Sequence, residues 1–321
     1  MLFRPTTDAD RDRVVAVTVD EPISWIPADR YLDELGQGMY RPEWTWIAED
    51  GDRVVARALW WGQPASEYPI ALDCLHVDAA VDDRTMVAAG LLTASLKAFA
   101  EQGAPKLPLY NVTLPNGWRE EASVTDALAW RRDAAVAAGL TDEVERLRLE
   151  WTPDAGLPTG GGLTFAGASD EEFLRVFRQV AVGSLDGETR RNLAAKGVEA
   201  TARDEMDFYL GCPGEREWWR LARNAQGETV GLAIPSATPY NRNVGYLGII
   251  PEFRGRGYVD GLLAEITRVH AEAGAELITA TTDTGNAPMA AAFARAGYRT
   301  AQIRMIYSAP ESAGTMGPPE S

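Results

Sequence analysis

The sequence predicts an α/β protein built from two copies of one unit, and three observations support this fold class. The chain has 321 residues, about twice the usual length of one domain. A stretch rich in proline and glycine, WTPDAGLPTGGG at 151–162, divides it into two segments of similar length. Both segments show strand and helix patterns in the same order. We therefore expect domains at 1–150 and 163–309, a linker at 151–162 and a flexible tail at 310–321.

The first segment opens with a short apolar run at 2–5 and a helix at 8–19. A hairpin follows, because β-prone runs that contain tryptophan flank the polar turn Asp50-Gly51-Asp52. Strands and helices then alternate as far as the linker. The predicted strands are 44–48, 54–61, 70–77, 107–112 and 144–151, and the later helices are 84–102 and 124–138.

The second segment repeats this order. Its first helix begins at Ser169, where Glu172 completes a capping box. A second hairpin that contains tryptophan turns at Gln226-Gly227-Glu228. The predicted strands are 163–165, 218–222, 230–234, 244–250, 277–281 and 299–308, and the helices are 169–181, 188–195, 257–273 and 287–296.

The charge of the chain disfavours one class of partner. There are 47 acidic and 31 basic residues, which gives a net charge of −16. A nucleic-acid binder needs an excess of lysine and arginine for its phosphate contacts, so we expect no nucleic-acid partner. An acidic chain suits a cationic or neutral partner, and a charge that serves only solubility is the alternative.

Cysteine and histidine are too few for a disulfide framework or a metal centre. Cys74 and Cys212 lie far apart, and His76 and His270 are the only histidines. We expect His270 on the surface of its helix. The N-terminus lacks a signal-peptide pattern, and no apolar stretch reaches the ~18 residues that span a bilayer. We therefore expect a soluble cytoplasmic protein, monomeric or homodimeric, without a metal or a membrane contact.

The segment 244–259, VGYLGIIPEFRGRGYV, is the most informative part of the chain. A buried strand stops at Pro251, and a loop of arginine and glycine leads directly into a helix. This arrangement directs free backbone N–H groups and the positive end of a helix dipole at one point. Gly255 and Gly257 permit close approach, and Arg254 and Arg256 add positive charge. The loop predicts a pyrophosphate site, and an exposed turn with two arginines explains it equally well on its own.

The same loop resembles the coenzyme A signature [RQ]-x-x-G-x-[GA] of the GNAT superfamily of acyl-CoA N-acyltransferases. The stretch 254–259, RGRGYV, matches its first four positions and departs at Val259, where relatives have a small residue. Downstream, Asn286 followed by Phe293 and Gly297-Tyr298 is similar to the family's N-x-x-[AM]…G-[FY] segment. The resemblance covers about 163–308, and the N-terminal half shares only the outline.

The resemblance implies two tandem GNAT-like domains, each a mostly antiparallel sheet with helices on both faces. It also implies acetyl-CoA as the co-substrate. The strand end would hold the pantetheine arm, the loop the pyrophosphate, and the next helix the rest of the arm. The implied coenzyme-binding residues are Ile249, Ile250, Arg254, Gly255, Arg256, Gly257, Tyr258, Val259, Asn286 and Phe293.

The catalytic groups depart from the family pattern. Many relatives have a tyrosine acid where this chain has Phe293, and a carboxylate in the strand where it has Asn243. Asp186, in the loop after the first helix of the second segment, is a candidate base or acceptor ligand. Its interpretation as the N-cap of helix 188–195 is favoured, and a proton relay through water is a third alternative.

These inferences predict an N-acetyltransferase in which a small-molecule amine attacks the thioester directly. A non-catalytic acyl-CoA-binding sensor or scaffold is the alternative, which the absent tyrosine and strand carboxylate keep open. In the first segment, 76–84 reads HVDAAVDDR, which lacks glycine and has three aspartates that would repel a pyrophosphate. We hypothesise that this half is a degenerate copy that has lost coenzyme binding.

Overall fold

The computed structural model describes residues 1–23 and 25–310, which form two compact units. Unit 1 combines Met1–Glu145 with the C-terminal strand from Gln302 onward, and unit 2 is Arg146–Ala301. Each unit is a mostly antiparallel sheet with helices, as the sequence predicts. Apart from Pro310, the predicted tail lies outside the described residues.

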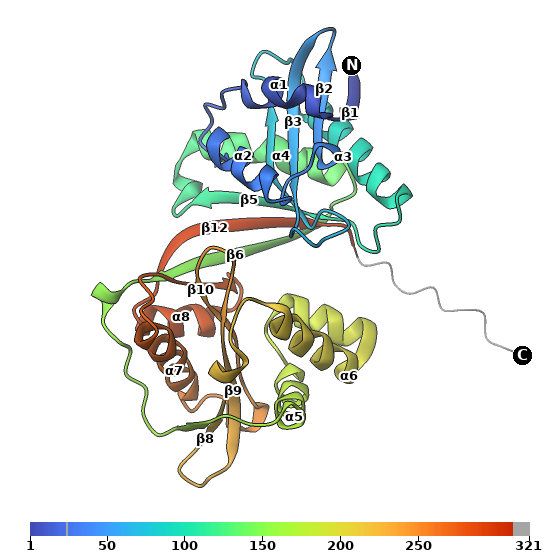
Figure 1. The fold of residues 1–321 in the computed structure, drawn as a ribbon. Coiled ribbons are helices and arrows are strands. Elements are labelled where there is room, and N and C mark those ends of the chain that lie inside the picture. The colour runs from blue at the N-terminus through green and yellow to red at the C-terminus, as the bar shows by residue number, and fades with distance from the viewer. Residues whose placement is uncertain (24, 311–321) are drawn as a thin grey trace, which may run out of the picture. The chain divides into compact units, whose positions relative to one another are not determined.

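Unit 1 has a six-stranded sheet in the order β1-β2-β3-β4-β5-β12, in which only β4 and β5 are parallel (Figure 1). Its strands are β1 (Leu2–Pro5), β2 (Thr45–Asp50), β3 (Arg53–Trp61), β4 (Ala71–Val77), β5 (Leu109–Pro115) and β12 (Arg299–Ser308). Its helices are α1 (Arg11–Val15), α2 (Ala28–Gly36), α3 (Arg84–Glu101) and α4 (Ala122–Ala137).

Unit 2 repeats this order as β7-β8-β9-β10-β11-β6, with β10 and β11 parallel. Its strands are β6 (Asp142–Trp151), β7 (Thr164–Ala166), β8 (Arg220–Arg223), β9 (Thr229–Ala237), β10 (Arg242–Ile249) and β11 (Ile278–Asp283). Its helices are α5 (Asp170–Ala181), α6 (Gly187–Gly211), α7 (Tyr258–Glu272) and α8 (Ala287–Arg295). Short 3₁₀ turns occur at Asp8–Asp10, Pro42–Trp44, Trp118–Glu120, Pro153–Ala155, Arg216–Trp218 and Pro251–Phe253.

Helices cover both faces of each sheet, because alternate strand residues point to opposite sides. In unit 2, Leu232 and Ile234 of β9 pack in one core with Phe173 and Phe177 of α5. Their neighbour Ala233 packs on the other side, in the core that contains the α7 residues Leu262, Leu263 and Ile266. In unit 1, neighbouring residues of β2 also point to opposite faces. Ile47 packs on the side of α1 and α2, and Trp46 packs on the side of α3.

The last strand of each predicted domain joins the other sheet. From Arg146 onward β6 pairs with β11, in the register Trp151↔Ile278, and β12 pairs with β5, in the register Tyr307↔Tyr110. The boundaries of the two compact units therefore differ from those of the contiguous domains expected at 1–150 and 163–309. Alternating apolar and polar residues determine which side of a strand is buried, but not which sheet the strand joins.

The first helix is shorter than the predicted 8–19. It consists of the 3₁₀ turn Asp8–Asp10 and α1, and residues 16–23 and 25–27 have no helical structure. The β-branched run of Val14, Val15, Val17 and Thr18 loses side-chain freedom in a helix, which favours an early end. In contrast, the predicted helix 188–195 continues as α6 to Gly211, with a kink at Gly197.

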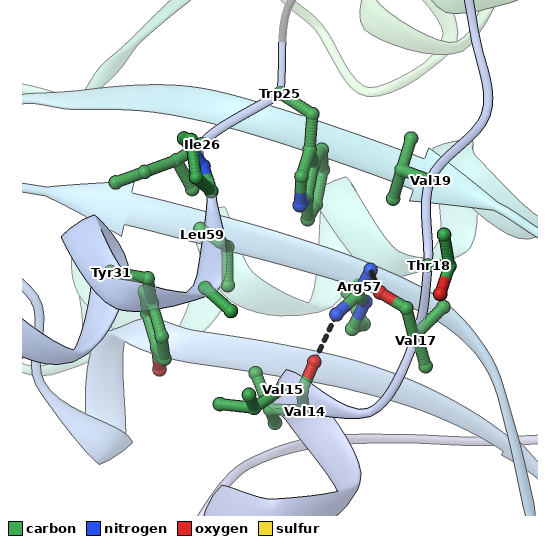
Figure 2. Close-up of a pocket in the computed structure, with 12 residues that line it drawn as sticks. Val14, Val15, Val17, Thr18, Val19, Trp25, Ile26, Tyr31, Arg57 and Leu59 are labelled. Atoms are coloured by element: carbon green, nitrogen blue, oxygen red, sulfur yellow. Dashed lines mark hydrogen bonds between the residues drawn. The ribbon is translucent and has the colours of Figure 1, made fainter.

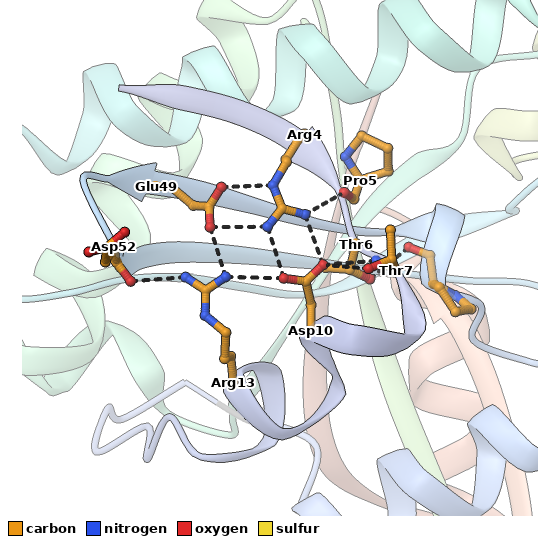
Figure 3. A network of polar contacts seen from close by, with 9 residues as sticks. Arg4, Pro5, Thr6, Thr7, Asp10, Arg13, Glu49 and Asp52 are labelled. Atoms are coloured by element: carbon orange, nitrogen blue, oxygen red, sulfur yellow. Dashed lines mark hydrogen bonds and ion pairs between the residues drawn. The ribbon is translucent and has the colours of Figure 1, made fainter.

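A cluster of two arginines and two carboxylates fixes the start of α1 to the sheet (Figure 3). Arg4 of β1 donates to both carboxylate oxygens of Asp10, at 2.8 and 2.9 Å, and to Glu49 of β2 at 2.7 Å. Arg13 of α1 donates to Asp10 at 3.1 Å and to Glu49 at 2.9 Å. The cluster therefore joins β1, β2 and α1 through charge-assisted hydrogen bonds.

The hydrogen bonds from Arg4 hold the pKa of Asp10 well below its usual range. Asp10→Asn is expected to lower the free energy of unfolding at pH 7 by about 1–3 kcal/mol. Because the folded pKa is depressed, the contribution of Asp10 is present above the ordinary carboxyl pKa of about 3.9 and is lost as the pH falls through the folded pKa. Urea unfolding at neutral and acidic pH should show the difference between Asp10→Asn and the natural protein shrinking in acid. Asp8→Asn is the control, since Asp8 is 84% exposed, and an equal loss in both variants would contradict the prediction.

Candidate functional site

A cavity of about 630 Å³ in unit 2 opens where two neighbouring strands diverge. β10 and β11 pair only through Arg242↔Ile278 and Asn243↔Thr279, and beyond these pairs the strands separate. The cavity is lined by β10, the loop after it, the starts of α7 and α8, part of α6 and the loop before α6. Strand separation therefore creates the opening within the sheet.

A β-bulge in β10 accompanies this separation. The register with β9 shifts between Asn243 and Tyr246, and Gly245 has a φ of +70°, which favours glycine. The Asn243 side chain accepts from Gly245 N at 2.7 Å and donates to Thr279 Oγ1 at 3.1 Å. Asn243, which stands where many relatives have a carboxylate, thus holds the bulge and the last strand pair together.

His270 supports the bulge from α7 and is not on the surface. It is fully buried, with Nε2 2.9 Å from the Asn243 carbonyl oxygen. Burial lowers the pKa of His270 to about 4, so the ring is neutral at pH 7. The expectation of a surface position was wrong, because His270 lies four residues after the buried Ile266 and therefore on the side of α7 that faces the sheet.

Beyond the bulge, β10 presents an unpaired edge to the cavity. Ile250 N donates to Val230 O of β9 at 2.9 Å. Because backbone groups alternate along a strand, the N–H groups of Leu247 and Ile249 point away from β9, toward the cavity. Ile249 lines the cavity, whereas the Ile250 side chain is buried in the core beneath α5. The structure therefore brings only the first of the two predicted isoleucines to the site.

The loop after β10 forms a cradle of free amides. Gly255 and Gly257 have φ values of +75° and +77°, and Gly257 is the N-cap of α7. In the described part of the chain, none of the N–H groups from residue 255 to residue 259 donates to a non-helical backbone acceptor. Gly255, Gly257, Tyr258 and Val259 all line the cavity. These amides, together with the helix dipole, provide a site for an anion.

The second predicted motif lies on the other side of the cavity. Asn286 is the N-cap of α8, but its side chain makes no capping hydrogen bond. Phe293 lines the cavity, is 2% exposed and packs edge-on against Tyr298, with ring centroids 5.2 Å apart. Tyr298 is buried, and its hydroxyl lies 2.9 Å from Thr267 Oγ1, so it belongs to the core. Both Asn286 and Phe293 thus face the same cavity as the amide cradle.

Residues 191–298, which contain both motifs, match the family model for the acetyltransferase (GNAT) family. This part of the chain is a GNAT domain. The matched range runs from α6 to the residue before β12, and it includes the cradle, the bulge and α8. The family resemblance seen in the sequence is confirmed.

Solved structures support the fold over nearly the whole chain. A GCN5-related N-acetyltransferase from Sphaerobacter thermophilus is similar over 95% of this chain and 94% of that chain, with 17% identity and a TM-score of 0.55. A glucosamine N-acetyltransferase region in a fungal multi-domain GH3 β-N-acetylglucosaminidase is similar over 95% of this chain and 38% of that one, with 16% identity and a TM-score of 0.54. At these identities the likeness concerns the fold. No curated protein matches the chain.

The two arginines of the cradle loop are directed away from its amides. Arg254 donates to the carbonyl oxygens of Gly183 at 2.7 Å, Val180 at 3.0 Å and Ile249 at 3.0 Å. It therefore ties the end of α5 to the end of β10. Arg256 is exposed, donates to Glu252 O at 3.1 Å and does not line the cavity. Arg254 lines the cavity, but its guanidinium donates to these backbone carbonyls, so the free donors of the loop are its amides.

Asp186 is the N-cap of α6. Its Oδ1 accepts from Thr189 N at 2.8 Å, and its Oδ2 lies 3.5 Å from a terminal nitrogen of Arg146. Asp186 also lines the cavity, so it lies near the site. Its carboxylate is at the same time the hydrogen-bond acceptor that caps the start of α6. The favoured N-cap interpretation agrees with this geometry.

Glu205 of α6 is a cavity residue that the sequence interpretation missed. Burial, reinforced by the negative charges of Glu188 and Asp186, raises the pKa of Glu205 to about 7. Among the described residues it has no hydrogen-bond or ion-pair partner. The sequence contained one signal for this residue. Tyr209 lies four residues after Glu205, a spacing that places both side chains on one face of a helix, and both line the cavity. Ending the predicted helix at residue 195 concealed that spacing.

The acidic groups outnumber the basic ones at this end of the cavity. Arg146 of β6 lies 2.8 Å from Asp283, 3.5 Å from Asp186 and 3.8 Å from Glu188. With Glu205, four carboxylates surround one guanidinium. Their excess negative charge favours a cation over an anion.

Unit 1 has the same strand separation, and charged side chains of the chain itself lie beside it. β4 and β5 pair only at Ala71↔Leu109 and Leu72↔Tyr110. Arg131 of α4 donates to Leu75 O at 3.0 Å and forms an ion pair with Glu21. A cavity of about 500 Å³ also opens at this place in unit 1, and the charged side chains of Glu21 and Arg84 line it.

The start of α3 in unit 1 differs from the start of α7 as well. Asp83 caps α3 by accepting from Met86 N at 2.8 Å, whereas α7 begins with free amides. Burial opposes ionisation of Glu21, but the His76 ring, whose Nδ1 lies 3.4 Å from a Glu21 oxygen, and the charges of Arg131 and Arg84 lower its pKa to about 2. Unit 1 therefore has a carboxylate that is ionised at neutral pH close to the start of α3.

Residues 1–23 and 25–310 offer neither a membrane span nor a metal centre. None of the helices there combines the length and the hydrophobicity that a membrane crossing needs. Within the same residues, no group of three or more histidine, cysteine or acidic side chains is arranged to hold a metal ion.

Arg254→Gln should lower the free energy of unfolding by about 2 kcal/mol, because several carbonyl oxygens at the end of α5 lose a charged donor. Thermal unfolding of the full chain measures this loss. Arg256→Gln is the matched control, since Arg256 is exposed like Arg254 but makes only one backbone hydrogen bond among the described residues. Equal melting temperatures for the two variants would show that Arg254 does not anchor α5.

Proposed function

We propose that the chain is an acyl-CoA-dependent N-acetyltransferase that transfers the acetyl group of acetyl-CoA to the amine of a small molecule. The observation that carries the proposal is one cavity that contains both an amide cradle and a carboxylate with a pKa of about 7. The first suits a pyrophosphate, and the second suits a general base at neutral pH. The GNAT domain at 191–298 is consistent with both roles.

The residues present fit coenzyme A. The amides from residue 255 to residue 259 would bind the pyrophosphate, and the positive φ of Gly255 and Gly257 leaves no side chain in the way. Ile249 and the side chain of Asn286, which makes no capping hydrogen bond, would contact the pantetheine arm. When bound, acetyl-CoA supplies an activated acyl group as a thioester.

Glu205 would prepare the acceptor amine. An ammonium has no lone pair, so a base must remove a proton before the amine can attack a carbonyl carbon. With a pKa of about 7, Glu205 is about half ionised at neutral pH and can accept that proton. The surrounding carboxylates Asp186, Glu188 and Asp283 would attract the cationic form of the acceptor.

The strand edge and a tyrosine complete the proposed machinery. The N–H groups of Leu247 and Ile249 face the cavity and would stabilise negative charge on an acyl oxygen. Tyr246 lines the cavity, and burial raises the pKa of its hydroxyl, which therefore keeps its proton at neutral pH. The Tyr209 hydroxyl already donates to Gly245 O at 3.2 Å. We therefore assign to Tyr246 the role of the acid that protonates the leaving thiolate of coenzyme A, which Phe293 cannot perform.

A non-catalytic acyl-CoA-binding protein is the second candidate, and Phe293 favours it. This residue offers no hydroxyl at the place where many relatives have their acid. The two candidates share coenzyme binding and differ in turnover, so separate measurements distinguish them.

Acetyl-CoA titrated into the full-length protein should bind, and Gly257→Glu should abolish this binding. The new carboxylate would place negative charge and a strained φ at the start of α7, where the pyrophosphate is expected. Gly274→Glu is the matched control, because Gly274 has a φ of +78° and lies just beyond the other end of α7. Calorimetry showing no binding by the natural protein would overturn both candidates, and unchanged binding by Gly257→Glu would overturn the assigned cradle.

Glu205→Gln should reduce kcat by roughly 10²–10⁴-fold while acetyl-CoA binding remains. Thiol release in the presence of an amine panel measures turnover. In the natural protein kcat should rise with pH through the Glu205 pKa of about 7, as the carboxylate loses its proton, and this rise should be absent in the variant. Asp207→Asn, which removes an exposed carboxylate from the same helix, is the control. Coenzyme binding without turnover of any amine would favour the binding protein instead.

A further inference from the structure

Unit 1 contains a second cavity that has a buried arginine at its base (Figure 2). The cavity measures about 330 Å³ and lies between the end of α1, the segment from Trp25 to the start of α2, and β3. Arg57 of β3 points into it and is 2% exposed. Most of the remaining wall is apolar and comes from Val15, Val19, Ile26 and Leu59, with the Trp25 ring over the guanidinium.

The protein uses only part of the hydrogen-bonding capacity of Arg57. One terminal nitrogen donates to Val14 O, and the other donates to Val17 O at 3.1 Å. The Nε–H group is buried and has no partner among the described residues. A guanidinium has five N–H donors, so capping the end of α1 leaves three of them unused.

Arg57 also lacks a counterion. No ion pair to an acidic side chain involves Arg57 in the described part of the chain, whereas the equally buried Arg131 pairs with Glu21. Desolvation lowers the pKa of Arg57 to about 10, which still leaves it charged at pH 7. An unpaired charge in an apolar interior is costly, and a bound anion would remove that cost.

The corresponding position in unit 2 shows that the fold does not require an arginine here. Leu232 of β9 is the residue that corresponds to Arg57. In unit 1, Ala56 pairs with the last residue of β4, and Arg57 comes next in β3. In unit 2, Gly231 pairs with the last residue of β10, and Leu232 comes next in β9. Leu232 is fully buried in the core beneath α5. A leucine therefore satisfies the packing at this place, and the arginine of unit 1 calls for another explanation.

We propose that the cavity around Arg57 binds a small monocarboxylate with an apolar tail. The carboxylate would accept from the unused N–H groups of the guanidinium, including Nε–H, in the bidentate geometry that arginine favours. The aliphatic side chains and the Trp25 ring would enclose the tail. A cavity of about 330 Å³ is at the lower end of the usual range for ligand sites, which limits the ligand to a small acid.

Phenylacetate and 3-methylbutanoate are the probes, titrated into the full-length protein by calorimetry, with quenching of tryptophan fluorescence as a second readout. Phenylacetate should bind, and the neutral phenylacetamide should bind at least about tenfold more weakly, because it lacks the charge that pairs with Arg57. This comparison needs no variant. Equal binding of acid and amide, or no binding of either acid at about 10 mM, would overturn the proposal.

Two variants locate the site. Arg57→Leu, which introduces the side chain that unit 2 has at Leu232, should lose phenylacetate binding by at least about tenfold, and Arg57→Lys should weaken it because lysine lacks the planar fork. Arg53→Leu, on the same strand, is the control, since Arg53 is 69% exposed and already pairs with Asp78. Acetyl-CoA binding in unit 2 should be the same in all of them. Unchanged phenylacetate binding by Arg57→Leu and Arg57→Lys would overturn the assignment to Arg57.

Discussion

The separation of β10 from β11 is the constraint on which the candidate active site depends. Two residue pairs hold these parallel strands together, and the bulge at Gly245 then turns β10 away. The exposed strand edge, the cavity and the approach to the α7 amides all follow from that divergence. Asn243 and His270 keep the last pair and the bulge in place, so two side chains without a catalytic assignment determine where the site can form.

The two units show how one backbone arrangement acquires different properties. Both separate their parallel strands after two residue pairs. In unit 1, Arg131 and Glu21 form an ion pair beside the gap, and Asp83 caps the following helix. In unit 2 the corresponding amides have no such partner among the described residues. The capacity to take an external anion at this place therefore depends on what the chain itself contributes there, since the strand geometry is shared.

The sequence predicted the fold class and the loop from residue 254 to residue 259, because strand and helix patterns and glycine at positive φ are local properties. It could not predict which sheet β6 and β12 join, since burial patterns do not identify pairing partners. Glu205 was missed because its raised pKa arises from tertiary burial and from charges elsewhere in the chain. The direction of Arg254 toward the end of α5 likewise depends on a contact between segments about seventy residues apart, which no local pattern specifies.

The exchange of β6 and β12 has a consequence for the order in which the protein can mature during synthesis. β12 is translated after every other strand of the described residues, yet it pairs with β5, whose residues are made far earlier. Until β12 leaves the ribosome, β5 is an unprotected sheet edge of the kind that invites aggregation. Unit 1, although it contains the first strands of the sequence, can therefore complete its sheet only after unit 2 has been translated.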